Sequence, residues 1–337
     1  SLWEPAAYLL PFLIGLAVFV VYPFINVFLI SFQNDYNMMT GAFDGFGVEN
    51  YRKILADPNF LNGLRNTALY VVFVVPVSTA ISLGIASMLN ANIRLKGLFQ
   101  TCYFLPMVTS ITAVGLVWKW MFNYDYGLIN YFLSFFGVEA INWLNDPKYN
   151  LAALILYGIW NMLPFTTILL LSGYQNIDRQ YYTAARVDGA KQARIFLRIT
   201  VPLLAPTIGL TLIVNTITAS KVFTELFPLF NGNPGSAYSL YTVVYYLYDM
   251  FYTKWELGPA AASAVVLLAL GALIMVFPFF WMLLSSVKTA AEVNTMPPTF
   301  WPAEPVFENY TFAFSKAPFG IYFVNSVIVT VACVATT

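Results

Sequence analysis

The stretch TAARVDGAKQARIFLRITVP, residues 183–202, carries four basic side chains among small residues in a chain that is otherwise strongly apolar. Of the 337 residues, 59% are hydrophobic and only 9% are charged. Soluble domains carry about a quarter charged residues, so the composition indicates an integral membrane protein. The stretch therefore reads as a polar segment between two membrane spans.

The apolar runs predict how often the chain crosses the membrane. A spanning helix needs about 20 mainly apolar residues, and six segments reach that length. A seventh begins near Phe323 and reaches Thr337 after about 15 residues. The sequence predicts an all-α, polytopic membrane helix bundle of six spans plus a truncated seventh. The six spans are roughly 9–32, 66–89, 98–122, 151–172, 202–223 and 258–284.

The distribution of lysine and arginine predicts the orientation. Loops 90–97 and 173–201 hold seven basic residues in 37 positions, whereas loops 33–65, 123–150 and 224–257 hold five in 95. The positive-inside rule places the first two loops in the cytoplasm. We therefore expect a cytoplasmic N-terminus and a cytosolic 183–202 stretch. The seven basic residues are Arg94, Lys96, Arg179, Arg186, Lys191, Arg194 and Arg198.

Local rules predict a turn and a helix within this stretch. Asp188 is a suitable N-cap for a helix that starts near Gly189, and Gly189 allows a sharp turn after a preceding short helix. Ile195, Phe196 and Ile199 recur at helical spacing and form an apolar stripe beside a basic face. On physical grounds alone, an amphipathic helix lying on anionic lipid is an alternative.

Two further features concern the ends of the stretch. Ala184 and Ala185 leave a surface thin enough for close packing in a groove of another protein. Pro202 and Pro206 fall at the start of the next span, where a missing N–H costs little.

The spacing Ala184-Ala185-(three residues)-Gly189-(nine residues)-Ile199-x-Val201-Pro202 resembles the "EAA" loop of ABC import permeases. That resemblance implies a coupling helix that docks into a cleft on a cytoplasmic ATPase subunit. Thr183 stands where the family has Glu, so we expect weakened rather than abolished coupling. The implied coupling residues are Thr183, Ala184, Ala185, Asp188, Gly189, Ile199 and Pro202.

Other stretches are similar to the carbohydrate-uptake branch of this family, of the maltose/glycerol-phosphate type: FLPMVTSITAVGLVWKWMFNYDYGLIN, GIWNMLPF and FNGNPG. The resemblance covers about 1–265 and implies the type I ABC importer permease fold in a bacterial or archaeal inner membrane. It also implies a second permease subunit forming a heterodimer, a cytoplasmic ATPase dimer, an extracytoplasmic solute-binding protein and contact with membrane lipid. Net charge is zero, so no nucleic acid is expected.

The chain contains an internal repeat. VYPF at 21–24 returns as VFPF at 276–279 with an offset of 255, and ENY at 49–51 returns at 308–310 with an offset of 259. Residues 271–337 therefore resemble the partial start of a second permease-like repeat. Counting the predicted spans places the two ENY loops on opposite sides of the membrane. We expect a junction of two genes or repeats near 265–275.

Polar groups within spans are costly and are candidates for function. Five positions match those that line the sugar site of maltose-type permeases: Asn161, Phe165, Asn215, Ala219 and Val222. Ala219 and Val222 lack the polar side chains of that relative, which points away from maltose and toward another sugar or polyol. The alternative is that Asn and Thr side chains here bind helices together.

The sequence contains no G-x-x-x-x-G-K-[ST], so we expect ATP and Mg to be bound by a separate ATPase subunit and no cofactor in this chain. It shows no nucleophile–base set and no metal-ligand spacing, and we predict a transport subunit rather than an enzyme. Two alternatives stay open. A secondary carrier would show inverted repeats, which are not seen within 1–265. A non-transporting broken fusion is the other.

Overall fold

The structure is a computed structural model that describes residues 3–91, 96–235, 238–293, 295, 299–316 and 318–336. Arg94 and Thr337 lie outside these residues. Within them the regular structure is helical, with one isolated antiparallel bridge between Gln33 and Phe46, and the predicted all-α class is confirmed. The chain divides into two compact units, one of residues 30–271 and one of residues 1–29 with 272–337.

Among the described residues, four helical segments are long and apolar enough to cross a membrane. Three bent helix pairs raise the number to seven if each pair is one span, which agrees with the predicted six plus one. The four segments are Leu10–Ser31, α4 (Pro58–Asn90), α8 (Asn150–Gln175) and α15 (Leu257–Ser286).

Two predicted spans are bent rather than continuous. Within 98–122, α5 (Lys96–Val108) and α6 (Ile111–Met121) meet at 98°. Pro106 lacks an N–H, and Ser110 leaves the helical region with ψ 128°, so the helix cannot continue.

Within 202–223, the segment that ends at Leu203 meets α12 (Ala205–Ser220) at 69°. Pro206 lies in the first turn of α12, as expected for a helix start.

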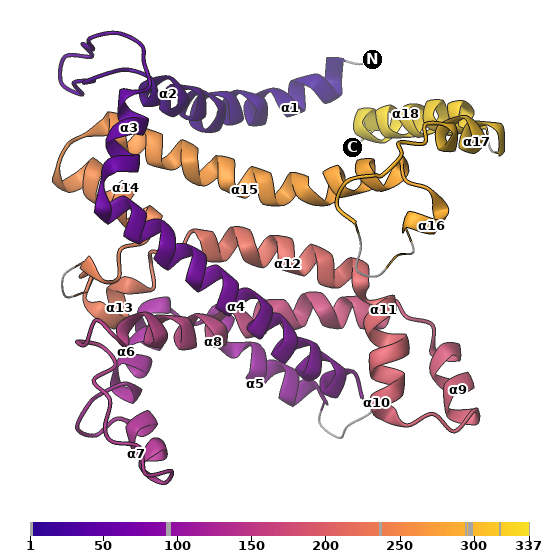
Figure 1. Cartoon of the computed structure of the whole chain (residues 1–337), viewed down its shortest axis with the longest axis horizontal. Coiled ribbons are helices and arrows are strands. Elements are labelled where there is room, and N and C mark those ends of the chain that lie inside the picture. The colour runs from indigo at the N-terminus through magenta and orange to yellow at the C-terminus, as the bar shows by residue number, and fades with distance from the viewer. Residues whose placement is uncertain are drawn as a thin grey trace. The chain divides into compact units, whose positions relative to one another are not determined.

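The core of the 30–271 unit is formed by α4, α8 and α12, which pack against one another (Figure 1). Close approach depends on small residues. A Cβ added at Gly158 on α8 would lie 2.1 Å from the Tyr70 hydroxyl of α4, and one at Gly173 would lie 2.7 Å from Thr207 Oγ1 of α12. Small side chains are how membrane helices come close enough to pack.

Short helices occupy the two ends of this unit (Figure 1). At one end lie α3 (Glu49–Ala56), α13 (Leu226–Phe230) and α14 (Val243–Tyr248), followed by a π-helical turn, η4 (Asp249–Thr253). At the other end lie α9 (Arg179–Val187), α10 (Gln192–Ile195), the π-helical turn η2 (Phe196–Thr200) and α11 (Val201–Leu203). Asn66 of α4 ties the first end together because its amide donates to the carbonyls of Ser239 and Tyr241, at 2.8 and 2.9 Å. The helix α7 (Leu128–Ser134) follows α6.

The other unit has its own helices. Residues 3–29 run through α1 (Trp3–Leu16), a π-helical turn at Ala17–Val21 and α2 (Tyr22–Ser31). Residues 272–336 comprise the end of α15 and then α16 (Ala290–Val293), α17 (Glu308–Lys316) and α18 (Phe319–Thr336). The seventh apolar helix thus begins at Phe319, slightly before the predicted start near Phe323.

Candidate functional site

The stretch 183–202 folds as two short helices joined by a left-handed turn. Gly189 has φ +73° and follows the end of α9. Its N–H donates to Arg186 O at 3.0 Å, and the Ala190 N–H donates to Ala185 O at 3.0 Å. These two bonds define a Schellman motif, which needs a glycine at the left-handed position. The predicted sharp turn at Gly189 is confirmed.

The predicted N-cap at Asp188 is wrong. Asp188 is the C-cap of α9, and α10 begins after Lys191, whose side chain makes no capping bond. The acidic cap lies one helix earlier, where the Asp178 carboxylate accepts the N–H of Gln180 at 2.9 Å. Both aspartates are short acceptors near a helix end, so local sequence does not tell them apart.

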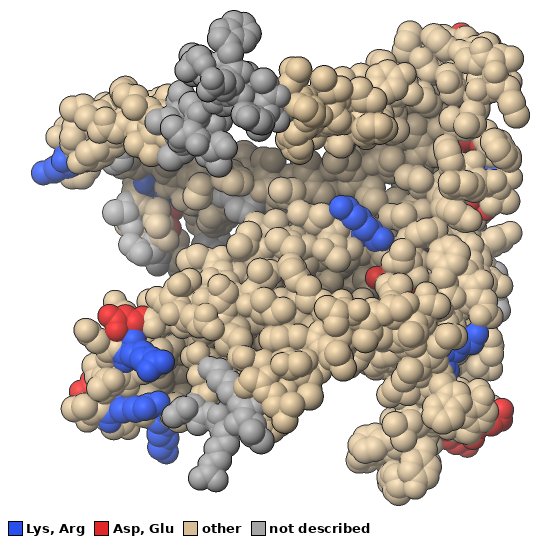
Figure 2. Space-filling model, turned by 180° about the vertical axis from the view of Figure 1, so that it is seen from behind, with Lys and Arg blue, Asp and Glu red and all other residues tan. Residues whose placement is uncertain are grey.

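The helical segment formed by α10 and η2 is amphipathic, as predicted. Ile195 is buried, whereas Phe196 and Ile199 are half-buried. Arg194 and Arg198 are exposed on the other face. Figure 2 shows lysine and arginine side chains gathered over this end of the 30–271 unit.

The implied coupling residues fall into three groups: residues that line a groove, residues that pack toward the protein, and residues that are exposed outside the groove. Thr183, Ala184 and Asp188 line a shallow groove of about 530 Å³ on α9, whose other lining residues are Arg179, Gln180 and Val187. The Thr183 hydroxyl donates to Arg179 O at 3.2 Å, and Val187 is 83% exposed at the rim. The groove thus combines an apolar side chain with polar neighbours.

The other coupling positions lie elsewhere. Ala185 is 8% exposed and faces the protein, so it does not contribute to the groove. Gly189 and Pro202 are exposed, and Ile199 is half-buried. Ala185 and Ile199 therefore support the segment from within, while Gly189 shapes its turn.

The five predicted pathway residues differ in exposure. Asn161 and Phe165 are exposed on α8, whereas Asn215, Ala219 and Val222 are buried. Ala219 and Val222 belong to the hydrophobic core.

Asn215 has specific partners. Its amide donates to Thr166 Oγ1 at 2.9 Å and Thr79 Oγ1 at 3.4 Å, and so joins α12 to α8 and α4. This geometry favours the alternative reading of Asn215 as a side chain that binds helices together.

A pocket that the sequence did not predict is lined in part by α3 and α14. These two helices lie at the opposite end of the unit from α9 and α10 (Figure 1). The pocket has a volume of about 770 Å³ and is lined by residues of the segments 35–57 and 246–259. The positive-inside rule, as applied to the sequence, predicts that both segments are extracytoplasmic. No local motif marks the pocket, because its two walls are distant in sequence.

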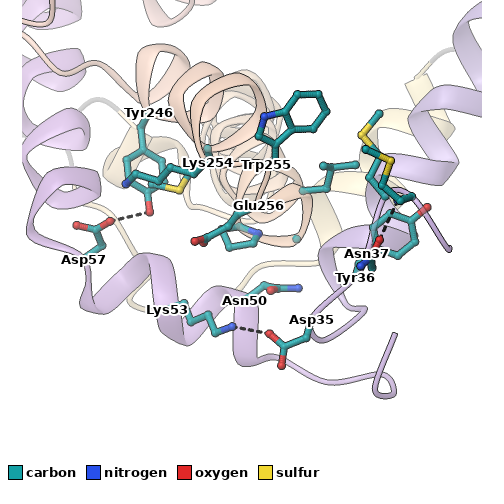
Figure 3. A pocket seen from close by; sticks show the side chains of 16 residues that line it. Asp35, Tyr36, Asn37, Asn50, Lys53, Asp57, Tyr246, Lys254, Trp255 and Glu256 are labelled. Carbon is teal, nitrogen blue, oxygen red and sulfur yellow. Dashed lines mark hydrogen bonds and ion pairs between the residues drawn. The ribbon is translucent and has the colours of Figure 1, made fainter. Parts of the chain in front are cut away.

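One ion pair and one tyrosine–carboxylate hydrogen bond lie in the walls of the pocket (Figure 3). Lys53 Nζ lies 2.8 Å from Asp35 Oδ1, and the Tyr246 hydroxyl donates to Asp57 Oδ2 at 2.9 Å. The hydrogen bond to Asp35 raises the pKa of Lys53, with nearby Glu256 adding to the effect. Burial and the bond to Asp57 raise the pKa of Tyr246 well above its usual value. Lys53 and Tyr246 therefore stay protonated at neutral pH.

Glu256 lies exposed among these pairs (Figure 3), and no ion pair or side-chain hydrogen bond of its carboxylate is seen in the described part of the chain. Trp255 beside it has φ +59° and is 60% exposed. A large residue in the left-handed region is unusual. Among the residues that the structure describes, no group of three His, Cys, Asp or Glu could hold a metal ion. The pocket thus presents an exposed carboxylate and an exposed indole.

Solved structures share this architecture. A bacterial ABC transporter involved in the import of the acidic polysaccharide alginate aligns with a TM-score of 0.69 and 22% identity, over 82% of this chain and 94% of that chain. At this level of identity the match shows the fold, and it supports the type I importer permease fold predicted above.

Two sugar transport permeases are similar to this chain in sequence. The sulfoquinovosyl glycerol transport system permease protein SmoG of Agrobacterium fabrum is 35% identical over 263 residues, 78% of this chain and 84% of the relative. The lactose transport system permease protein LacF of Rhizobium radiobacter is 33% identical over 269 residues, 79% of this chain and 89% of the relative. Residues 77–284 match the model of one family. The chain belongs to that family, the binding-protein-dependent transport system inner membrane components.

Proposed function

We propose that this chain is the membrane-spanning permease subunit of an ATP-driven importer for a sugar or sugar-like solute, such as an oligosaccharide, a polyol or glycerol phosphate. The observation that carries the proposal is the exposed α9–α10 segment with its Schellman turn, at the opposite end of the 30–271 unit from α3 and α14, whose residues line the pocket. Three permeases of sugar transport systems that are more than 30% identical to this chain over the aligned residues support the substrate class.

The cytoplasmic end is proposed to dock an ATPase dimer, which binds ATP and Mg and performs the hydrolysis. The α9 groove presents Val187 as an apolar contact and the Asp188 carboxylate as a charged one. The family's glutamate is replaced by Thr183, whose hydroxyl is already bonded to Arg179 O. Docking then rests on the shape of α9 and on its basic surroundings.

The extracytoplasmic pocket is proposed to receive an extracytoplasmic solute-binding protein. A solved relative was captured with an alginate pentasaccharide-bound periplasmic protein, which supports such a partner. The exposed Glu256 carboxylate suits a lysine or arginine of that partner, and Trp255 suits an aromatic or apolar contact. The pocket walls are already braced by Lys53–Asp35 and Tyr246–Asp57, so docking needs little rearrangement.

The substrate pathway is proposed to lie between two permease subunits in a multi-pass inner membrane assembly. Asn161 and Phe165 are exposed on one face of α8, as residues of an intersubunit pathway must be. An amide for hydroxyl groups and an aromatic ring for a sugar face are the chemistry that such a site needs. Asn215 contributes by fixing α12 against α8 rather than by touching substrate.

Uptake of labelled sugars into proteoliposomes tests this function. The chain is assembled with its partner permease and ATPase, and a panel of neutral oligosaccharides and glycerol phosphate is supplied with binding protein outside. We expect uptake that needs ATP inside and persists when ionophores collapse ion gradients. Uptake that needs an ion gradient and no ATPase would instead identify a secondary carrier, and no uptake of any sugar would support the non-transporting alternative.

A further inference from the structure

A buried asparagine closes the end of α2. Asn50 is 1% exposed, and its amide donates to the carbonyls of Ser31 and Gln33 at 3.1 and 2.8 Å. Ser31 is the last residue of α2, and the last carbonyls of a helix lack partners of their own. The neighbouring Tyr51 hydroxyl lies 2.8 Å from the Ser31 hydroxyl. We call Ser31, Gln33, Asn50 and Tyr51 the Asn–Tyr clamp.

The same clamp recurs in the C-terminal part of the chain. Asn309 donates to the carbonyls of Ser286 and Lys288 at 2.9 and 2.8 Å. The Tyr310 hydroxyl lies 2.5 Å from the Ser286 hydroxyl, and Ser286 is the last residue of α15. Each residue stands at the offset of 255 or 259 that relates the two ENY sequences.

Backbone bonds repeat along with the side chains. Gly47 N–H donates to Phe32 O at 2.7 Å, and Val306 N–H donates to Val287 O at 2.8 Å. The helices α3 and α17 both begin at the glutamate of Glu-Asn-Tyr. A recurrence of side-chain and backbone bonds in register is not expected from similar apolar strings alone. It supports a repeated structural module whose two copies each tie a loop to the end of an apolar helix.

The first clamp also contacts the start of the last helix of its unit. A Cβ added at Gly258 would lie 2.6 Å from Asn50 Oδ1, so the α15 backbone rests directly on the clamp. The loop between Gln33 and Asn50 supplies residues 35–39 of the extracytoplasmic pocket. Asn50 therefore joins the end of α2, the start of α15 and one wall of the pocket.

We propose that Asn50 and Tyr51 are positioning residues for transport. They hold the 34–48 loop in the shape that the binding protein meets, and they connect this loop to α2 and α15, so that docking and helix movement are linked. The tail carries a second copy of the module in Ser286, Lys288, Asn309 and Tyr310. The inference rests on the proposed docking of a solute-binding protein at this pocket.

Hydrogen exchange on the full chain in lipid nanodiscs tests the clamps without any partner. Asn50→Asp keeps the side-chain size but replaces the donating amide with a carboxylate facing two carbonyls. Asn309→Asp is the matched control in the second copy. We expect exchange in 34–48 to become at least tenfold faster in Asn50→Asp, equal to about 1.4 kcal/mol, while 299–307 is unchanged. For Asn309→Asp we expect the reverse, with faster exchange in 299–307 and unchanged exchange in 34–48.

A milder variant guards against misfolding. Tyr51→Phe removes only the hydroxyl pair with Ser31, and we expect a smaller acceleration confined to the same loop. Exchange in 34–48 that stays within twofold of the natural chain in both variants overturns the clamp.

Binding-protein-stimulated ATP hydrolysis of the assembled importer tests the positioning role. For Asn50→Asp we expect the half-saturating concentration of binding protein to rise about tenfold, equal to about 1.4 kcal/mol. Asn309→Asp should leave the concentration dependence as it is. A merely structural role would lower the rate of hydrolysis at saturating binding protein without raising the half-saturating concentration, and that result overturns the proposal.

The two assays separate this inference from the proposed function. If the natural chain supports uptake and Asn50→Asp is stimulated normally, the positioning role fails and the importer stands. If the natural importer responds to no binding protein, docking and positioning fail together, and the exchange pattern alone decides whether the clamps exist.

Discussion

The turn between α9 and α10 allows a sharp prediction because its cost arises from one backbone angle. Gly189 has φ +73°, and an added Cβ would meet no atom within 4 Å. The substitution Gly189→Ala therefore introduces backbone strain without steric overlap. A non-glycine residue in the left-handed helical region costs about 1–2 kcal/mol. That cost shifts the local equilibrium of the turn by a factor of about 5–30.

Gly137 provides a matched control. It has the same φ of +73° and also no atom within 4 Å of an added Cβ, but it follows α7. Hydrogen exchange of the Ala190 amide, which bonds to Ala185 O, reports on the first turn. We expect exchange there to accelerate about 5–30-fold in Gly189→Ala and to stay unchanged in Gly137→Ala. The affinity for the ATPase should fall only in Gly189→Ala.

A third variant, Gly189→Asn, tests whether backbone strain explains the glycine. Asparagine tolerates the left-handed region better than alanine does, so Gly189→Asn should lie between the natural chain and Gly189→Ala. If Asn costs as much as Ala, or if neither changes exchange at Ala190, backbone strain does not explain the glycine. If Gly137→Ala weakens ATPase capture equally, the effect is not local to the coupling segment.

Three further predictions concern the core and the pocket. Gly158→Ala places a Cβ 2.1 Å from a hydroxyl of α4 and should lower the free energy of unfolding by about 1–3 kcal/mol. Thermal melting in detergent measures the change; the control Gly84→Ala, in the interior of α4 with open space around the added Cβ, should not lower the melting temperature because alanine favours the helix more than glycine does. Asn215→Ala removes a buried amide bonded to two threonines and should cost about 1–3 kcal/mol; a variant that melts normally but loses sugar uptake would instead place Asn215 on the substrate. The pKa of Tyr246 is raised in the folded chain, so the stability that this tyrosine contributes is complete below its unfolded pKa of about 10 and is lost as the pH rises above that value. The melting temperature should therefore fall less steeply between pH 9 and about pH 12 in Tyr246→Phe than in the natural chain. An identical slope would contradict the raised pKa of Tyr246.

Some features followed from sequence because they depend on short-range properties. The length of an apolar run decides whether a helix can cross the bilayer, so α4, α8 and α15 were predictable as spans. Gly189 was predictable because few residues other than glycine accept its backbone angle. The apolar stripe at Ile195, Phe196 and Ile199 follows from helical spacing alone, and the structure confirms it.

Other features depend on partners that are distant in sequence. Helical spacing puts Asn161 with Phe165 and Asn215 with Ala219, but it does not say which face meets another helix. The structure turns the first pair outward and the second pair inward. The 98° bend between α5 and α6 depends on the broken helix at Ser110, which a hydropathy count does not register. The pocket was not predictable because two distant loops form its walls.

The proposed importer function depends on the α9–α10 segment, which we propose couples this chain to an ATPase. Co-purification with sugar-importer ATPases tests it most directly, comparing the natural chain with Gly189→Asp and Ala184→Glu. Ala184 is exposed in the α9 groove, so its replacement alters the docking surface without disturbing the buried Ala185. Gly137→Asp is the control at the other turn with the same backbone angle. We expect the natural chain and the control to capture the ATPase and both coupling variants to release it. If no variant captures the ATPase, or if neither coupling substitution changes capture, the α9–α10 segment does not couple the chain to an ATPase.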